Sequence, residues 1–358
     1  MATIRAIAIH VAPRQWEPLE VLTQCIELAT RLVDGAKDLG LEVWTWRIIF
    51  PPLPREVGFE DLKRMADSLD RELPKEFLIH VAAVEPDHPA VPKVLDLLEN
   101  RPRIYACARC SNDAEALRIF DTLWNSRKEP DVYTRFAVAI GTWVETPYLP
   151  ATASLSMVEG FSAALRYVDL VEEAILRGSG DKLLNYVKDV EQKLLELSKM
   201  CRIPFLGIDL SLSPWMSESV AGLVEKLIDA KFGSLGTINA IRALNMLVKA
   251  IAGKLKIKTI GFNEVMLPVA EDDVLNNRVK EGFVRLRDLV YLSMVCVVGL
   301  DMVAVPRDLV DHRRLAIDML TIYNMKRTPV GVRVIPVDKS PGEEVELPRY
   351  GKTFVVHL

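Results

Sequence analysis

The chain has 358 residues, 50% of them hydrophobic, with a net charge of −4 at pH 7 and an isoelectric point near 5.9. This length and composition are sufficient for a large core, and the slightly acidic balance argues against a general electrostatic attraction to nucleic acid or to anionic membranes. The sequence has no run of about 18 or more uncharged apolar residues, so we expect no membrane-spanning helix.

Apolar stretches alternate with helical patterns in the first part of the chain. The predicted strands cover residues 4–11, 41–50, 77–84, 104–108 and 136–140, and the predicted helices cover 22–39, 59–69, 90–98 and 114–124. Segment 141–156, with two prolines and many hydroxyl groups, interrupts this alternation. Two long helices, predicted over 157–176 and 181–200, then divide the chain.

The alternation resumes after this helical divide. The predicted strands cover 204–210, 259–267, 301–305, 330–337 and 354–357, and the predicted helices cover 217–231, 237–254, 272–281, 286–298 and 307–324. Strands that alternate with helices pair in parallel, because each crossover needs a covering helix. We therefore predict one domain, a ten-stranded α/β barrel of two five-stranded halves (about 1–150 and 202–358) around a divide at 156–201. An open doubly wound α/β sheet is the alternative.

Polar residues gather where the strand predicted over 204–210 ends. Asp209, Ser211 and Ser213 share one face of this strand, because side chains alternate along it. Such polarity at the end of a buried strand is typical of a pocket lining. Glu218 and Ser219 follow at the start of a helix, where backbone amides could hold an anion. The alternative is helix capping together with one satisfied buried aspartate.

Two other junctions could contribute to a site. In the turn GSLGT, which opens a helix, amides near Gly236 and Thr237 could hold a phosphate or carboxylate, or the segment is a simple turn with Thr237 as a cap. In FNEVMLPVAEDD, Asn263, Glu271 and Asp272 surround a strand-to-helix junction, and the helix dipole alone accounts for acidic residues such as Asp272 there. Glu264 lies within the apolar strand, so with Asp209 it could form an acid/base pair or part of a hard-metal site.

Further candidates are less specific. In segment ETPYLPAT, Tyr148 and Thr152 could offer hydroxyl groups to a ligand, or the segment is a rigid connector. Cys296 is flanked by valines, which is typical of an inert core thiol, although we keep it as a candidate nucleophile. Asp301 begins the next apolar run and could be a ligand.

The cysteines and histidines form no recognisable site. The five cysteines are scattered, which predicts reduced thiols in a cytoplasmic protein, and Cys107 and Cys110 lack the second pair that a zinc site needs. No HExxH or GxSxG motif is present. The N-terminal stretch lacks the apolar region of a signal peptide, and the scarcity of glutamine favours a thermophilic source.

Several segments, taken in order over about 190 residues, resemble the family called domain of unknown function 711. They are TPYLPAT (146–152), GIDLSLSP (207–214), ESVAGLVEKL (218–227), FGSLGT (232–237), LPVAEDD (267–273), CVVGLDMVAVP (296–306) and VRVIPV (332–337). The resemblance implies a fold like the pyruvate formate-lyase barrel, and it implies no established reaction. Pocket positions implied by it are Thr146, Pro147, Pro150, Asp209, Ser211, Glu218, Ser219, Gly236, Thr237, Glu271, Asp272, Cys296, Gly299 and Asp301.

The likeness to that barrel does not extend to its radical chemistry. A glycyl radical needs a loop of the type R-V-[ST]-G-[YF] near the C-terminus. The nearest glycine, Gly331 in TPVGVRVIPV, lacks this context, and no adjacent cysteine pair is present.

We therefore predict an enzyme acting on a small polar or anionic metabolite. Asp209 and Glu264 would serve as acid/base groups or metal ligands, and Ser211, Ser213 and Ser219 would help to hold the anionic group. The remaining candidate ligand contacts are Thr146, Tyr148, Thr152, Glu218, Gly236, Thr237, Asn263, Glu271, Asp272 and Asp301. The alternative is a non-catalytic metabolite-binding or regulatory protein that uses the same pocket. The sequence names no cofactor. We expect no nucleic-acid or membrane partner, and we expect a homo-oligomer, most simply a dimer through the helices over 157–200.

Overall fold

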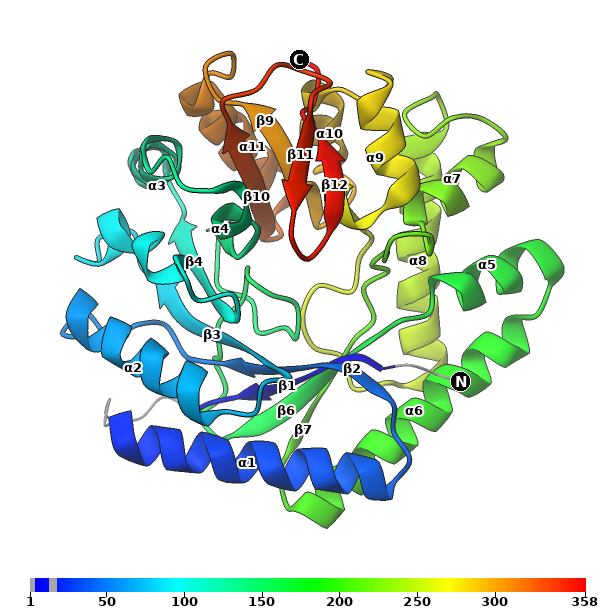
Figure 1. Cartoon of the computed structure of the whole chain (residues 1–358). Coiled ribbons are helices and arrows are strands. Elements are labelled where there is room, and N and C mark those ends of the chain that lie inside the picture. The colour runs from blue at the N-terminus through cyan, green and yellow to red at the C-terminus, as the bar shows by residue number, and fades with distance from the viewer. Residues whose placement is uncertain (1–3, 13–17) are drawn as a thin grey trace. The chain divides into compact units, whose positions relative to one another are not determined.

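The computed structural model describes residues 4–12 and 18–358. It shows a mixed α/β fold with a ten-stranded sheet in the order β7-β6-β1-β2-β3-β4-β5-β10-β9-β8 (Figure 1). The chain forms two compact units: unit 1 comprises Met1–Cys107, Trp143–Leu210 and Lys249–Asn263, and unit 2 comprises Ala108–Thr142, Ser211–Val248 and Glu264–Leu358. The boundary at residue 107 falls within strand β4 (Ile104–Cys110).

The ten strands fall into two groups of five. The first five strands in sequence are β1 (Ile4–His10), β2 (Val43–Ile49), β3 (Phe77–Val84), β4 and β5 (Phe136–Ile140), and the later five are β6 (Gly160–Leu165), β7 (Phe205–Asp209), β8 (Met266–Pro268), β9 (Val298–Pro306) and β10 (Val330–Val337). Strand β1 pairs antiparallel with β6, and β5 pairs antiparallel with β10. The first five strands are therefore one contiguous block, with β6 and β7 on one side of it and β10, β9 and β8 on the other. The predicted α/β fold with a ten-stranded sheet is confirmed.

Two errors in the prediction cancel in this count. The helix expected over 157–176 is wrong in its first part, because Gly160–Leu165 is strand β6 and helix α5 (Val168–Arg177) begins after it. The small residues of GFSAAL suit either structure, and pairing with β1 decides for a strand whose six residues are all buried. The last predicted strand overlaps β12 (Gly351–Phe354), which pairs with β11 (Glu344–Leu347) outside the main sheet.

Unit 1 has helices on one side of its strands. Helices α1 (Pro18–Asp38), α2 (Phe59–Glu72) and α6 (Gly180–Cys201) lie along this side (Figure 1), and the short helices η1 (Val91–Lys93) and η2 (Asp96–Leu98) follow β3. Helix α2 shows why they dock: its buried residues Leu62, Met65, Ala66 and Leu69 recur at helical spacing and form one apolar stripe. The segment around Pro147 lies on the opposite side of these strands, where it bonds to Arg47 of β2.

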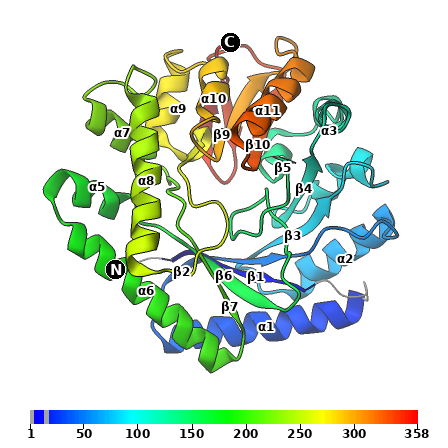
Figure 2. The ribbon, with the colours of Figure 1, turned by 180° about the vertical axis from the view of Figure 1, so that it is seen from behind.

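Unit 2 has several helices around its strands. They are α3 (Asp113–Asn125), α4 (Pro130–Thr134), α7 (Val220–Ile228), α8 (Thr237–Leu255, which continues into unit 1), η3 (Val269–Glu271), α9 (Asp273–Lys280), α10 (Leu286–Leu292) and α11 (His312–Lys326). Helices α10 and α11 lie beside β9 and β10 (Figure 2). Within residues 4–12 and 18–358, no helix is both long and apolar enough to cross a membrane.

Candidate functional site

A polar face of the sheet in unit 1 is the first candidate site. Strand register places His10, Arg47, His80, Ser162 and Asp209 on this face, because paired residues of neighbouring strands point the same way. Ala8 pairs with both Arg47 and Ser162, and Ile49 lies between His10 and His80. None of the five polar side chains is more than 7% exposed. We call this set the polar face.

Small residues separate these polar side chains and leave room above the strands. They are Ala6, Ala8, Gly160, Ala164 and Gly207. Segment 145–152 occupies this room. Arg47 Nη1 donates to the Pro147 carbonyl at 2.6 Å, and the Cys107 thiol donates to the Thr152 carbonyl at 3.4 Å. The polar face therefore holds the segment that sequence analysis singled out as ETPYLPAT.

Asp209 anchors one end of this arrangement. Its carboxylate, which is 0% exposed, accepts hydrogen bonds from Thr146 Oγ1 at 2.6 Å and from the amides of Phe262 at 2.9 Å and Asn263 at 3.1 Å. Gly261 has a φ of +77°, and a Cβ there would lie 2.1 Å from Asp209 Oδ2. Only glycine allows this approach. The carboxylate is thus a satisfied buried group that ties strand β7 to residues 261–263 and to Thr146.

The hydroxyl groups of segment 145–152 hold its shape. Thr146 Oγ1 accepts from the Tyr148 amide at 3.2 Å, and Thr152 Oγ1 donates to the Thr146 carbonyl at 2.9 Å. Tyr148 is 8% exposed, and its ring centroid lies 6.0 Å from the Arg5 guanidinium carbon. Asn263 accepts from the Leu210 amide at 2.9 Å through its side-chain oxygen. The predicted ligand-binding residues of this region therefore interact with other parts of unit 1 and stabilise it.

A carboxylate, an imidazole and a hydroxyl lie in line at the other end of the polar face. His10 Nε2 is 2.7 Å from Ser162 Oγ, and His10 Nδ1 is 3.5 Å from Glu145 Oε1. His10 and Ser162 are fully buried, whereas the Glu145 side chain is 14% exposed. Glu145 also accepts from the amides of Leu155 at 2.8 Å and Ser156 at 3.0 Å, which fix its carboxylate beside the imidazole.

The surroundings set the protonation of this line of groups. Burial lowers the pKa of His10 to about 4, although Glu145 opposes the shift. Partial burial alone would raise the pKa of Glu145, but His10 and the hydrogen bonds from Ser156 and Leu155 outweigh it and lower that pKa. At neutral pH the site holds a carboxylate beside a neutral imidazole, and the second ring nitrogen of that imidazole contacts a hydroxyl group. This is an arrangement that can accept and pass on a proton.

In unit 2, Glu264 and Cys296 meet through a lysine. Lys326 Nζ lies 2.7 Å from Glu264 Oε2 and donates to the Cys296 carbonyl at 2.7 Å. The Ser211 hydroxyl accepts from the Glu264 amide at 3.3 Å. Burial raises the pKa of the Cys296 thiol to about 12, and this thiol donates to the Leu292 carbonyl at 3.1 Å. The thiol therefore stays protonated at neutral pH, as expected of an inert core cysteine.

Arg333 joins two further candidates of unit 2. Its Nε lies 2.6 Å from Asp301 Oδ1 and its Nη2 lies 2.9 Å from Glu271 Oε1, while Nη1 donates to the Thr134 carbonyl at 3.2 Å. All three charged side chains are 8–9% exposed. Burial raises the pKa of Asp301, and the adjacent Arg333 opposes this shift. The cluster is a nearly dry ion-pair network that fixes β9 to β10.

Asp272 caps two helices. It accepts from Ser219 Oγ, from the Ala221 amide of α7 at 3.0 Å, and from the Leu275 amide of α9 at 3.1 Å. Ser219 in turn accepts from the Gly222 amide at 2.7 Å. Both residues cap helix N-termini, which is the alternative that sequence analysis gave for Ser219, whereas for Asp272 it gave the helix dipole. Burial raises the pKa of Asp272, and these hydrogen bonds oppose the shift.

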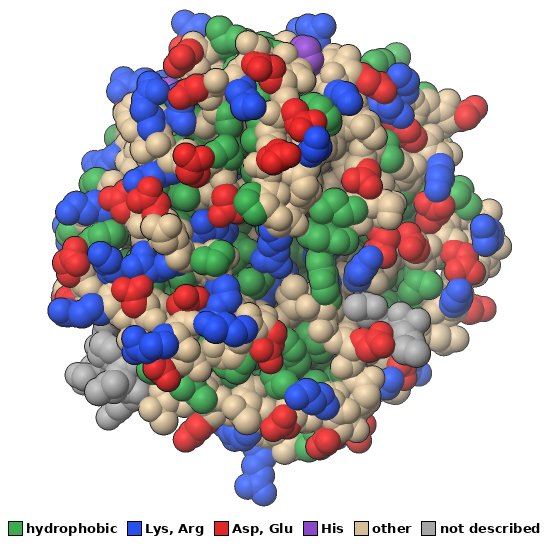
Figure 3. Space-filling view, in the orientation of Figure 1, with side chains coloured by type: hydrophobic (Ala, Val, Ile, Leu, Met, Phe, Trp, Pro, Cys, Tyr) green, Lys and Arg blue, Asp and Glu red, His purple; other side chains and the backbone are tan. Residues whose placement is uncertain are grey.

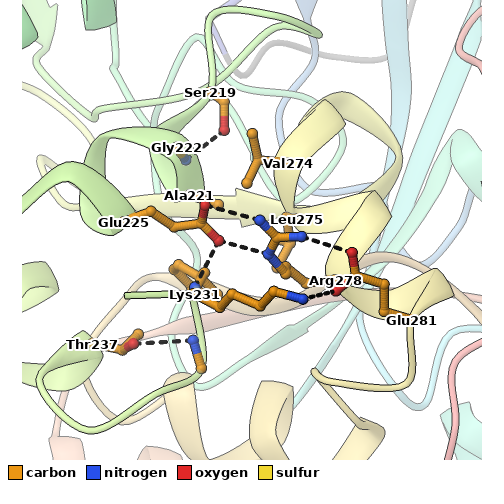
Figure 4. Close-up of polar contacts among 12 residues, drawn as sticks. Ser219, Ala221, Gly222, Glu225, Lys231, Thr237, Val274, Leu275, Arg278 and Glu281 are labelled. Atoms are coloured by element: carbon orange, nitrogen blue, oxygen red, sulfur yellow. Dashed lines mark hydrogen bonds and ion pairs between the residues drawn. The ribbon is translucent and has the colours of Figure 1, made fainter. Parts of the chain in front are cut away.

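The glycine turn near Thr237 lies beside a network of ion pairs (Figure 4). Thr237 Oγ1 accepts from the Gly233 amide at 3.0 Å, and Gly236 has a φ of +102°. Beside this turn, Arg278 binds Glu225 through two bonds of 2.6 and 3.0 Å and Glu281 through one of 2.9 Å. The hydroxyl of Thr237 thus closes the turn itself.

Ser213 and Glu218 complete the set of predicted residues. Ser213 is 4% exposed, and the main chain of Glu218 exchanges two hydrogen bonds with that of Trp215, at 3.0 and 3.1 Å.

Across the described ranges, no three or more His, Cys, Asp or Glu side chains are grouped so that they could hold a metal ion.

The sequence reading missed the residues with the clearest acid/base geometry. His10 and Arg47 are polar residues inside apolar strands, and that is the same signal that led to Asp209. Ser162 was hidden by the wrong helix prediction over 157–176. Their common feature is position on one face of neighbouring strands, which needs the strand register.

Comparison with known proteins places the chain among uncharacterised proteins. Residues 123–348 match the family model described as "Uncharacterised ACR (DUF711)". A UPF0210 protein of Sulfurisphaera tokodaii is 28% identical over 247 residues, 64% of this chain and 56% of that protein. A UPF0210 protein of Neisseria meningitidis is 36% identical over 156 residues, 42% of this chain and 35% of that protein. The chain thus spans about half the length, or less, of these curated relatives.

One solved structure shows a distant likeness. The class Id ribonucleotide reductase alpha subunit of Actinobacillus ureae aligns with 76% of this chain and 60% of its own, at 11% identity and a TM-score of 0.40.

Proposed function

Because this chain belongs to the uncharacterised DUF711 family, whose description names no reaction, we propose a function from the polar face itself. The protein is an enzyme that acts on a small polar or anionic metabolite by general acid/base chemistry in unit 1. The observation that supports this proposal is the line formed by Glu145, His10 and Ser162, with distances of 3.5 and 2.7 Å.

Each group has a role that follows from its surroundings. Glu145, the member of the line whose side chain is partly exposed (14%), takes a proton from the substrate and passes it to His10 Nδ1, while the Ser162 hydroxyl contacts Nε2 at 2.7 Å and holds the ring. Glu145 stabilises the imidazolium that forms, which matters because burial strongly disfavours that charge. Arg47 supplies the positive charge that attracts an anionic group. Asp209 accepts a hydrogen bond from Thr146, and this bond helps to position the neighbouring residue Glu145.

The test compares turnover in matched variants. The wild type and the variants Glu145→Gln, Ser162→Ala and Glu196→Gln are each incubated with a metabolite extract, and consumed compounds are followed by mass spectrometry. We expect at least one compound to be consumed, and we expect Glu145→Gln and Ser162→Ala to slow this by about 100-fold, the usual size of an acid/base contribution. Glu196 is exposed on α6, so its variant is the control. Equal turnover in all four proteins would exclude the relay.

A non-catalytic metabolite-binding or regulatory role is the second candidate. This role is favoured because both carboxylates that the sequence predicted to be catalytic already bind groups of the protein itself. Asp209 accepts three hydrogen bonds, and Glu264 pairs with Lys326. Retention of a metabolite by the wild type, with no product formed over hours, would favour this role over the enzyme.

The proposal includes no nucleic-acid partner and includes self-association. Lys and Arg side chains are interspersed with Asp and Glu on the face seen in Figure 3, which offers no extended basic surface there.

Exposed apolar side chains on α5 and α6, namely Ile175, Leu176, Leu195 and Met200, are the surface through which we expect a dimer to form. Light scattering coupled to size exclusion would measure this directly, and a monomer at all concentrations would exclude it.

A further inference from the structure

A cavity in unit 1 lies apart from the polar face. Its volume is about 400 Å³, and it lies between the last turns of α1 and the start of β2, with Arg166 beyond the end of β6. Trp44 and Trp46 lie on the opposite face of β2 from Arg47, because side chains alternate along a strand. The cavity is therefore separate from the line of Glu145, His10 and Ser162, and the inference drawn from it does not depend on the proposed function.

The walls combine aromatic, aliphatic and cationic groups. The Arg166 guanidinium carbon lies 5.6 Å from the Trp44 ring centroid, and that of Arg5 lies 5.3 Å from the same ring. Trp46 is 8% exposed and packs against Phe77, with ring centroids 5.8 Å apart, so its indole is held in place. Aliphatic side chains of α1 and β2 complete the lining. The surfaces are flat and rigid, which favours a flat ligand.

The charges around the cavity select the sign of the ligand. Lys37 and Arg166 line it together with Glu42, and Arg5 adds a third cation behind Trp44. Lys37 also pairs with the exposed Asp34 at 3.8 Å, so Arg166 is the cation that lies directly beside the aromatic wall. An arginine beside an aromatic wall suits a carboxylate whose ring packs on the apolar surface, because the guanidinium binds carboxylates in a bidentate manner.

We propose that this cavity binds a small aromatic carboxylate. The carboxylate contacts Arg166, with Lys37 nearby, and the ring lies against Trp46 and the aliphatic wall. A volume of about 400 Å³ is at the lower end of ligand pockets, which fits one or two fused rings with a short acidic group.

The experiment uses 2-naphthoate as the probe, with binding measured by calorimetry and by quenching of tryptophan fluorescence. The comparison ligands are cyclohexanecarboxylate, which is anionic but not flat, and 2-naphthylmethylammonium, which is flat but cationic. We expect 2-naphthoate to bind at least tenfold more tightly than either. We expect Arg166→Gln and Trp46→Leu to weaken its binding at least tenfold, whereas Arg177→Gln, an exposed arginine on α5, leaves it unchanged.

The outcomes that overturn the proposal are distinct. They are no measurable binding of 2-naphthoate, equal binding of the cationic probe, or unchanged binding in Arg166→Gln. Because Trp46 is buried and its variant could fail to fold, Lys37→Gln serves as a second variant at an exposed position, with an expected loss of two- to threefold. If Lys37→Gln and Arg166→Gln, tested separately, both bind 2-naphthoate with unchanged affinity, the proposal is also overturned.

Discussion

The burial of His80 makes the stability of the protein depend on pH in a calculable way. This side chain is 0% exposed, and among residues 4–12 and 18–358 neither ring nitrogen has a hydrogen-bond partner. Burial lowers the pKa of His80 to about 3 from its ordinary value of 6.5, and the nearby carbonyl of Pro150 offsets only part of this shift. In the folded protein His80 therefore stays neutral at every pH above about 4.

The sign of the effect follows from linkage. The unfolded chain binds a proton at His80 as the pH falls below 6.5, but the folded chain does not until the pH nears 3, so stability is complete above 6.5 and falls between these values. At about pH 5 the free energy of unfolding is lower by about 2 kcal/mol than at about pH 7.5. This follows because pH 5 lies about 1.5 units below the unfolded pKa of 6.5, and each unit contributes about 1.4 kcal/mol. His10, whose pKa is lowered to about 4, adds a second loss of about 2 kcal/mol at the same pH.

The assay is urea unfolding of the wild type and of His80→Leu at these two pH values, followed by circular dichroism. We expect the variant to lose about 2 kcal/mol less than the wild type between about pH 7.5 and pH 5. The His80→Gln variant guards against repacking effects and should behave in the same way. An equal loss in the wild type and both variants would mean that the folded protein protonates His80 at an ordinary pKa, so that water reaches the ring and the polar face is not dry.

Three other perturbations probe the remaining clusters. Replacing Gly261 with alanine should destabilise the protein by about 3 kcal/mol or more, because a Cβ would displace the Asp209 carboxylate, and an unchanged melting temperature would contradict this. Lys326→Met should cost about 3 kcal/mol in chemical denaturation by leaving Glu264 unpaired, and adding Glu264→Met should recover most of it; additive losses would show that the pair is unimportant. Cys296 should resist Ellman's reagent at about pH 8 in the native protein and react in urea, and rapid native labelling at this residue would contradict its raised pKa of about 12.

The alternation of strands and helices could be predicted from the sequence because it depends on local properties, namely apolar runs and the residues that end them. Strands β1 to β5 are apolar runs bounded by prolines, glycines or polar caps, and the structure confirms all five. Strand β6 could not be recognised, because GFSAAL carries small residues with no strong preference. Its residues pair with β1 residues that lie at least 150 positions earlier in the chain, and that pairing is what makes the segment a strand.

The sequence also identified Asp209 as a buried polar residue, but not its partners. It indicated that Asp209 needs a partner, since an unpaired buried carboxylate is costly. Its partners proved to be Thr146 and the amides of residues 262 and 263, which are 53 to 63 positions away. The pairing of Glu264 with Lys326, 62 residues apart, was equally out of reach.

Composition, periodicity and caps are local properties, so the sequence alone established the α/β class, the first five strands and the polar end of strand β7. The line of Glu145, His10 and Ser162 joins three separate parts of the chain, and only the register of β1 against β6 brings its histidine and serine together. A shift of that register by one residue would turn Ser162 to the other side of the sheet. The tertiary structure therefore decided which of the many polar residues can act together.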